Sequence, residues 1–132
     1  MKRRRKLILY PKENPKSNNV NVKIQYFGSC LGLFGDRDKD SSCYRIFIEL
    51  VKSSKGADPI SSQRLAYKLN LSRGTVVHHL NRLMDFGIVQ ESSNRYSLVN
   101  PSLEKVVNSL SVEFIKLFDN LKKVAEELDK QL

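Results

Sequence analysis

The central part of the chain contains two short helical patterns separated by only three residues, and this spacing restricts the fold more than any other feature. Apolar side chains recur at helical spacing over about 62–69 and again over 73–86. Residues 70–72 between them leave room only for a tight turn. Serines precede both segments as capping residues, and Gly87 follows the second as a helix stop. The pattern predicts two helices joined by a tight turn.

The segments on either side extend this helix pair into a small domain. A further helix is predicted before it, over about 42–54, and two strand-like runs follow it at 88–91 and 95–99. The polar residues 92–94 form a hairpin tip between the two runs. Three helices, a tight turn and a hairpin define a winged helix-turn-helix. The expected fold class is therefore mainly α with a small β wing (α+β).

The residues of this region resemble a known family. The run SQRLAYKLNLSRGTVVHHLNRL at 62–83, followed by FGIV at 86–89, is similar to the ArsR-type winged-helix regulators, particularly their archaeal members. The resemblance covers about residues 41–100, and the chain departs from the usual pattern at Val77, where a serine is common. It implies a protein that binds double-stranded DNA and regulates transcription, although winged helices also serve as protein-docking modules.

The helix over 73–86 has one face for the core and one for DNA. Val76, Leu80 and Leu83 are expected to face the core. The outward positions are candidates for base contacts in the major groove: Arg73, Gly74, Val77, His78 and Asn81. The candidates for phosphate contacts are Ser62, Arg64, Ser72, Thr75 and Arg82, and the wing over 90–96 adds Asn94 and Arg95 for the backbone or the minor groove. The alternative is that these side chains only form a solvated surface, and for His79 a structural hydrogen bond is at least as well supported as a DNA contact.

The positive charge of the chain is concentrated in two regions. The formal net charge is +9, and residues 1–35 carry eight basic side chains against one acidic side chain. Residues 61–100 carry five against two, whereas residues 101–132 carry five against six. Such basic regions favour a polyanion through phosphate neutralisation. The N-terminal arm contributes Lys2, Arg3, Arg4 and Arg5 as candidate DNA contacts, and a solubilising tail is an equally supported interpretation.

Residues 1–40 are predicted to add short strands to this basic arm. Val20, Val22, Ile24 and Tyr26 alternate with polar residues, which indicates a strand over 20–27, and residues 7–10 can pair with it. The apolar residues 30–34 are expected to form a loop that packs against the body. Asp and Ser residues within 36–42 are expected to cap the helix at 42–54.

A heptad pattern dominates the C-terminal segment, 101–132. Apolar residues follow alternating spacings of four and three at Leu103, Val107, Leu110, Phe114, Leu117, Leu121, Val124 and Leu128. A helix of about thirty residues extends about 45 Å, which is too long for a winged domain of this size to cover. We therefore expect a coiled-coil-like dimerisation helix, a homodimer and an inverted-repeat DNA site whose half-sites lie about one helical turn, roughly 34 Å, apart. The alternative is a helix that packs only on its own domain.

Other function classes have little support in the sequence. The chain contains no GxSxG, phosphate-loop or HExxH motif, and its two histidines are adjacent on a helix, where they point apart. No catalytic residue, metal site or cofactor is predicted. Cys30 and Cys43 match no metal-binding spacing and indicate two core thiols or, less simply, a thiol switch. No apolar run reaches the length of a membrane span, so a cytoplasmic protein with no membrane partner is expected.

Two other binding functions remain open at this point. A winged helix can act as a protein-interaction module of a larger complex without specific DNA binding, using the long helix to contact a different protein. The basic arm can also bind RNA.

Overall fold

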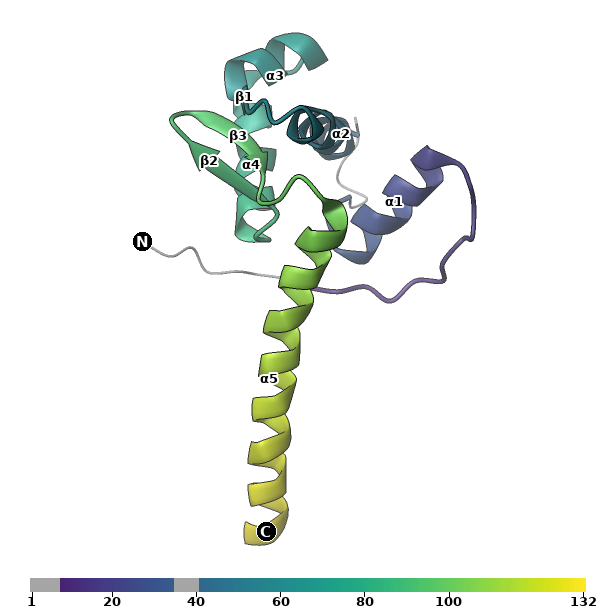
Figure 1. Ribbon diagram of the computed structural model, residues 1–132, viewed down its shortest axis with the longest axis vertical. Coiled ribbons are helices and arrows are strands. Elements are labelled where there is room, and N and C mark those ends of the chain that lie inside the picture. Colours follow the sequence, from purple (N-terminus) through teal and green to yellow (C-terminus); the bar gives the residue numbers. More distant parts are fainter. Residues whose placement is uncertain (1–7, 35–40) are drawn as a thin grey trace. The chain divides into compact units, whose positions relative to one another are not determined.

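The computed structural model describes residues 8–34 and 41–132 (Figure 1). The predicted arm residues Lys2, Arg3, Arg4 and Arg5 lie outside this described part, as do the predicted capping residues at 36–40. The chain divides into two compact units, Met1–Pro101 and Ser102–Leu132, which are described separately.

The first unit is a winged helix-turn-helix preceded by an additional helix, and it confirms the predicted fold class. Its elements follow one another in this order: α1 (Val20–Cys30), α2 (Ser42–Lys55), β1 (Ile60–Ser61), α3 (Ser62–Leu69), α4 (Arg73–Asp85), β2 (Val89–Ser92) and β3 (Arg95–Leu98). The helices at 42–54, 62–69 and 73–86 and the hairpin were all predicted, and their bounds agree within one or two residues.

The wing is a three-stranded antiparallel sheet in the order β1-β3-β2. Val89 pairs with Leu98 in the hairpin, and Ile60 of β1 pairs with Tyr96. The two tip residues, Ser93 and Asn94, have φ angles of 52° and 62°, as a two-residue hairpin turn with the twist of the flanking strands requires. Strand β1 was not predicted, because two residues are too short to show an alternating pattern.

The core of this unit lies where α2, α3, α4 and the wing meet. The fully buried side chains are Leu33, Cys43, Ile46, Phe47, Leu50, Leu65, Val76, Leu80, Leu83 and Ile88. Two polar contacts fix α2 against its neighbours: the Arg45 guanidinium donates to the Leu69 carbonyl at the end of α3, and the Leu98 N–H of β3 donates to Ser54 Oγ over 3.0 Å. The burial of Val76, Leu80 and Leu83 confirms the predicted core residues of α4.

The strand predicted over 20–27 is wrong, because these residues form α1. The Asn19 side chain caps this helix by accepting from the N–H groups of Asn21 and Val22, over 2.9 and 3.2 Å. The alternating residues that suggested a strand include Val20, which is 66% exposed. A second pattern at helical spacing, Ile24, Phe27, Gly28 and Leu31, supplies the half-buried and buried positions instead.

The N-terminal residues 8–10 also form no strand beside 20–27. They follow an irregular path, and the Tyr10 N–H donates to the Cys30 carbonyl over 2.8 Å. The loop after α1 packs as predicted: Leu31 and Leu33 are buried, and the Phe34 ring meets Tyr44 and Phe47 edge to face, at centroid distances of 5.3 and 6.0 Å.

Two helices end at a glycine in the left-handed conformation. Gly32 after α1 has a φ of +69°, and Gly87 after α4 has a φ of +80°. In each case the next residue donates its N–H to a carbonyl of the last helical turn: Leu33 to Gly28, over 2.8 Å, and Ile88 to Leu83, over 3.1 Å. The predicted helix stop at Gly87 is confirmed.

The start of α2 differs from the prediction of a serine cap. Ser41 stands at the cap position, but its φ of 53° is left-handed and its side chain makes no capping hydrogen bond. A capping side chain normally reaches the helix amides from an extended backbone, which Ser41 does not have. The Arg45 N–H still bonds to the Ser41 carbonyl over 2.9 Å, so the helix starts there without the side-chain contact.

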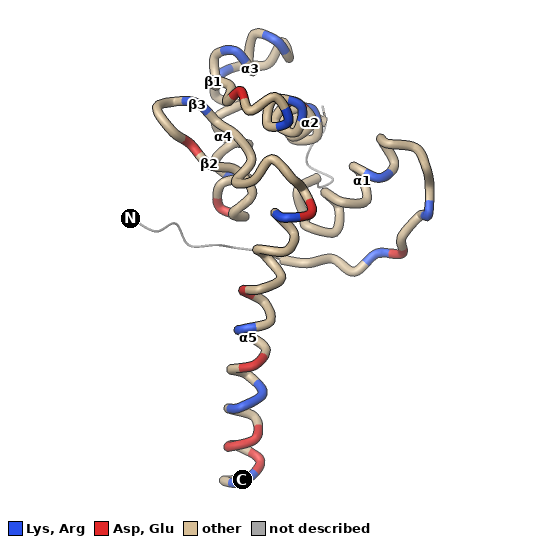
Figure 2. The backbone as a smooth tube through the Cα atoms, viewed as in Figure 1, with Lys and Arg blue, Asp and Glu red and all other residues tan. Residues whose placement is uncertain are grey.

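The second unit is one helix, α5 (Leu103–Gln131), which confirms the predicted long C-terminal helix. Its 29 residues extend about 44 Å, and Ser102 caps it by accepting from the Lys105 N–H over 3.3 Å. Basic and acidic residues alternate along the sequence of this helix (Figure 2). Among the described residues, no helix combines the length and apolar character that crossing a membrane requires.

Candidate nucleic-acid interface

Helix α4 separates its core residues from the residues predicted to read bases. Val76, Leu80 and Leu83 are fully buried on one face. On the other face, Arg73, Gly74, His78 and Asn81 are exposed and Val77 is half-buried. A Cβ atom built on Gly74 would meet nothing within 4 Å, so the surface of the helix is open at its first turn. This face can approach a flat partner closely.

The first turn of α4 is held by two hydroxyl groups. Ser72 Oγ accepts from the Thr75 N–H over 3.1 Å and donates to Thr75 Oγ1 over 2.8 Å. Because the hydroxyl proton of Ser72 is used inside the turn, the proton of Thr75 is the one left to donate to another group. Of the two predicted phosphate contacts, Thr75 is therefore the better donor and Ser72 is the cap that positions it.

The two histidines of α4 have different environments. His79 is 9% exposed and lies on the core side, which favours the structural alternative over a DNA contact. His78 is exposed, and its ring meets that of His79 edge to face with centroids 5.2 Å apart. Only His78 is accessible to a partner of this helix.

Arg82 lies at the other end of α4 and is half-buried. Its guanidinium donates to the Gly32 carbonyl over 3.5 Å, and it lines a cavity of about 350 Å³ with Tyr10, Asp85 and Phe86. This position links α4 to the loop after α1. The structure thus gives Arg82 a packing contact, and its predicted phosphate contact stays a prediction.

A second candidate surface is the depression between α2, α3 and the wing, which we call the basic depression. It has a volume of about 390 Å³, and it is lined by Glu49, Lys52, Ser53, Asp58, Pro59, Ile60, Ser61, Arg64, Lys68 and Arg95. Four of these residues are basic and two are acidic. Arg64 was predicted to contact phosphates, and Arg95 was predicted to contact the backbone or the minor groove. They are far apart in sequence, and the fold brings both to one depression.

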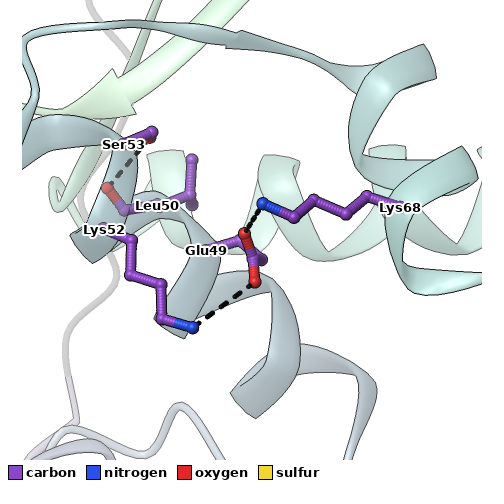
Figure 3. Close-up of polar contacts among 5 residues, drawn as sticks. All are labelled: Glu49, Leu50, Lys52, Ser53 and Lys68. Atoms are coloured by element: carbon purple, nitrogen blue, oxygen red, sulfur yellow. Dashed lines mark hydrogen bonds and ion pairs between the residues drawn. The ribbon is translucent and has the colours of Figure 1, made fainter.

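The acidic residue Glu49 fixes one wall of the basic depression. Its side chain is 11% exposed and pairs with Lys68 of α3 at 2.8 Å and with Lys52 at 3.9 Å (Figure 3). Because both lysines compensate this nearly buried carboxylate, they are partly neutralised. The four basic and two acidic side chains leave an excess of two positive charges, and Arg64 and Arg95 are the two basic residues that Glu49 does not pair with.

The remaining predicted contacts in this region differ in accessibility. Asn94 and Arg95 are exposed at the wing, and Arg95 donates to the Pro59 carbonyl over 3.3 Å. Ser62 is 8% exposed, and the cap of α3 is Ser61, whose hydroxyl accepts from the Arg64 N–H over 3.1 Å. The side chain of Ser62 thus lies in the interior, away from any phosphate.

Lys52 and Lys68 of the basic depression, and Tyr67 of α3, which does not line it, were not predicted as contacts. The two lysines share the partner Glu49, and Lys68 reaches it from another helix. The spacing of residues within one helix does not predict such a contact between α2 and α3. Tyr67 is 85% exposed on α3, an unusual exposure for an aromatic side chain. Its helical position opposite the buried Leu65 and Leu69 was the available signal.

The thiols lie apart from this interface. Cys43 is buried, Cys30 is half-buried at the end of α1, and no disulfide joins them. The Cys30 side chain raises the pKa of Tyr26 above its ordinary value, chiefly through a hydrogen bond, with smaller contributions from desolvation and charge. The described residues contain no group of three His, Cys, Asp or Glu side chains that could hold a metal ion.

The fold and the exposed face of α4 define a winged helix-turn-helix domain of the DNA-binding class. Residues 59–91 match the family model described as "Bacterial regulatory protein, arsR family". The chain therefore contains an ArsR-family helix-turn-helix domain, which is the DNA-binding domain of transcription regulators. The match spans β1 to the middle of β2 and gives no support to the expected closeness to archaeal members. Neither the comparison with curated proteins nor that with solved structures found a match.

Proposed function

We propose that this protein is a transcription regulator that binds double-stranded DNA at specific sequences as a homodimer. In this proposal α4 enters the major groove, and the wing over 90–96 lies on the adjacent backbone or minor groove. The observation that carries the proposal is the exposed face of α4 inside an ArsR-family domain. In this proposal the protein has no catalytic role and acts in the cytoplasm.

The base contacts come from the exposed face of α4. Arg73 can donate two hydrogen bonds to a guanine, and Asn81 can pair with an adenine. Val77 can pack on a thymine methyl group, and His78 can reach a base edge from the same face. The open surface at Gly74 supports this arrangement, because no side chain holds the helix away from the groove.

The phosphate contacts surround this face. Thr75 offers a hydroxyl donor at the start of α4, where the helix dipole and the amides also favour an anion. Arg64 and Arg95 line the basic depression and can bind a phosphate there, and Asn94 lies at the wing tip. We also propose that the basic arm contacts the DNA backbone through Lys2, Arg3, Arg4 and Arg5. Ser62, Ser72 and Arg82 support the structure of the domain.

The homodimer is proposed to form through α5. Its heptad residues Leu117, Leu121, Val124 and Leu128 are each about half exposed within the single chain, at 52, 52, 50 and 47%. Leu103 and Phe114 are half-buried, Val107 is 41% exposed and Leu110 is 5% exposed. A second copy would remove the exposed residues from water, and the resulting two-fold symmetry predicts an inverted-repeat site.

The test is selection of binding sites by the full-length protein. A library of duplexes with a randomised centre is incubated with the purified chain, and bound duplexes are sequenced after several rounds. The proposal predicts enrichment of an inverted repeat with half-sites one helical turn apart. Enrichment of a single half-site would overturn the dimer, and a final pool identical to the input would favour a protein-interaction module instead.

A further inference from the structure

The apolar stripe of α5 is wider than a two-stranded coiled coil needs. We propose that the C-terminal half of α5 associates in fours, so that two DNA-binding dimers join through one four-helix bundle. This inference rests on the proposed homodimer and adds a second contact between copies of the chain.

The width of the stripe is the first observation. With Val107, Phe114, Leu121 and Leu128 at heptad position a, the d positions are Leu103, Leu110, Leu117 and Val124. Position e, next to d, is occupied by Phe118 and Ala125 in the same half of the helix. Phe118 is 64% exposed, more than any seam residue. A two-stranded coil needs only a and d, whereas an apolar a, d and e face is typical of helices in larger bundles.

The residue types in the seam are the second observation. Near the start of α5 the seam pairs a β-branched Val107 at a with Leu110 at d, the combination that favours two strands. Near the end the order is reversed, with Leu121 and Leu128 at a and the β-branched Val124 at d. Leucine at a with a β-branched residue at d shifts the preference toward higher oligomers. The change occurs where the e positions become apolar.

The charges at the edges of the stripe are the third observation. In two-stranded coils, oppositely charged residues at e and g pair between helices. Here Glu113 and Glu127 occupy g, but the e positions from residue 111 onward are Ser111, Phe118 and Ala125. A two-stranded coil of α5 would therefore lack these ion pairs and leave Phe118 in water. A bundle buries the e positions instead.

The charge balance of α5 favours further copies of this chain as the partner. Residues 101–132 carry five basic and six acidic side chains, whereas the chain as a whole carries +9. Nearly neutral helices can approach one another without net repulsion. A nucleic acid or an anionic membrane surface would instead require an excess of basic residues along the polar face.

The experiment measures the mass of the full-length protein by sedimentation equilibrium over a wide range of concentrations. The wild type is compared with Phe118→Glu, which places a charge at an e position while leaving every a and d residue intact. Val112→Glu is the matched control, because Val112 is also exposed (50%) but occupies the opposite, f position. We expect four-chain particles for the wild type and for Val112→Glu, and half that mass for Phe118→Glu.

The outcomes separate this inference from the proposed function. A wild type that remains a dimer at every concentration overturns the four-helix bundle and leaves the dimer standing, whereas a monomer overturns both. Four chains for Phe118→Glu would show that the e positions do not hold the assembly together. A Phe118→Glu monomer would assign Phe118 to the two-stranded contact. Both results count against the inference. Circular dichroism of each variant shows whether α5 still forms.

The bundle also changes how DNA is bound. A four-chain particle carries two DNA-binding dimers, so we expect the wild type to bind two duplexes of the selected site per four chains. The Phe118→Glu dimer is expected to bind one duplex with unchanged affinity for a single site. One duplex per four chains for the wild type would contradict the arrangement.

Discussion

Helices α4 and α5 have similar apolar periodicities, but their apolar residues differ in burial. In α4 the periodic residues Val76, Leu80 and Leu83 are fully buried, whereas in α5 Leu117 and Leu121 remain 52% exposed. Apolar spacing thus marks a face that avoids water without indicating which partner covers it. In α4 that partner is the rest of the winged domain, and for α5 we propose other copies of the chain.

The largest effect is expected for Leu117→Glu in α5. In the proposed dimer, a carboxylate at this d position would be desolvated without a compensating charge, at a cost of several kcal/mol. We predict a monomer in sedimentation velocity, with the thermal unfolding of the winged domain unchanged. A Leu117→Glu protein that keeps the mass of the wild type would show that the seam is not the contact.

Leu80→Ala in α4 tests the other side of the comparison. Leu80 is fully buried, so its truncation should remove about 2–5 kcal/mol from the free energy of unfolding, measured by urea denaturation. The matched control is Tyr67→Ala, at an 85% exposed position of α3, which should change stability by less than about 0.5 kcal/mol. Equal losses in the two variants would contradict the described core.

A smaller effect is expected for Arg73→Ala on the exposed face of α4. Loss of a two-point contact to guanine should weaken binding to the selected site by about 1–3 kcal/mol and relax the preference at that base. The control is Lys123→Ala on α5, which removes the same charge from the other unit of the chain. If Arg73→Ala weakens binding to all sequences equally in a fluorescence titration, Arg73 contacts a phosphate instead.

The smallest effect is expected from removing residues 1–6. The arm carries five of the basic residues, so its loss should make the dependence of DNA affinity on salt less steep, with little change in sequence preference. The slope of the logarithm of affinity against that of salt concentration measures this effect. An unchanged slope would exclude the arm from the interface.

The winged domain could be predicted from the sequence because its local signals agree with one another. The helical spacing, the Ser72 cap and the Gly87 stop all indicate the same element, α4. At α1 two signals compete. The alternation of Val20, Val22 and Ile24 suggested a strand, but the Asn19 cap and the packing of Phe27 on Phe47, with centroids 5.8 Å apart, stabilise a helix.

The candidate interface was less predictable because accessibility depends on tertiary contacts. Arg82 and Ser62 have residue types typical of phosphate contacts, yet one bonds to the Gly32 carbonyl and the other lies in the interior. The basic depression also depends on the approach of Arg95 to Arg64, which are separated by the whole of α4 and β2. Sequence spacing within one helix carries no information on such approaches.

The central claim is that this chain binds duplex DNA through its winged domain. The most direct test is sedimentation of the full-length protein, alone and with random 30-base-pair duplex, at low and at physiological salt. The account predicts a self-associated protein that sediments with the duplex at low salt and is released steeply as salt rises. A protein that sediments as a monomer and ignores the duplex even at low salt would contradict it.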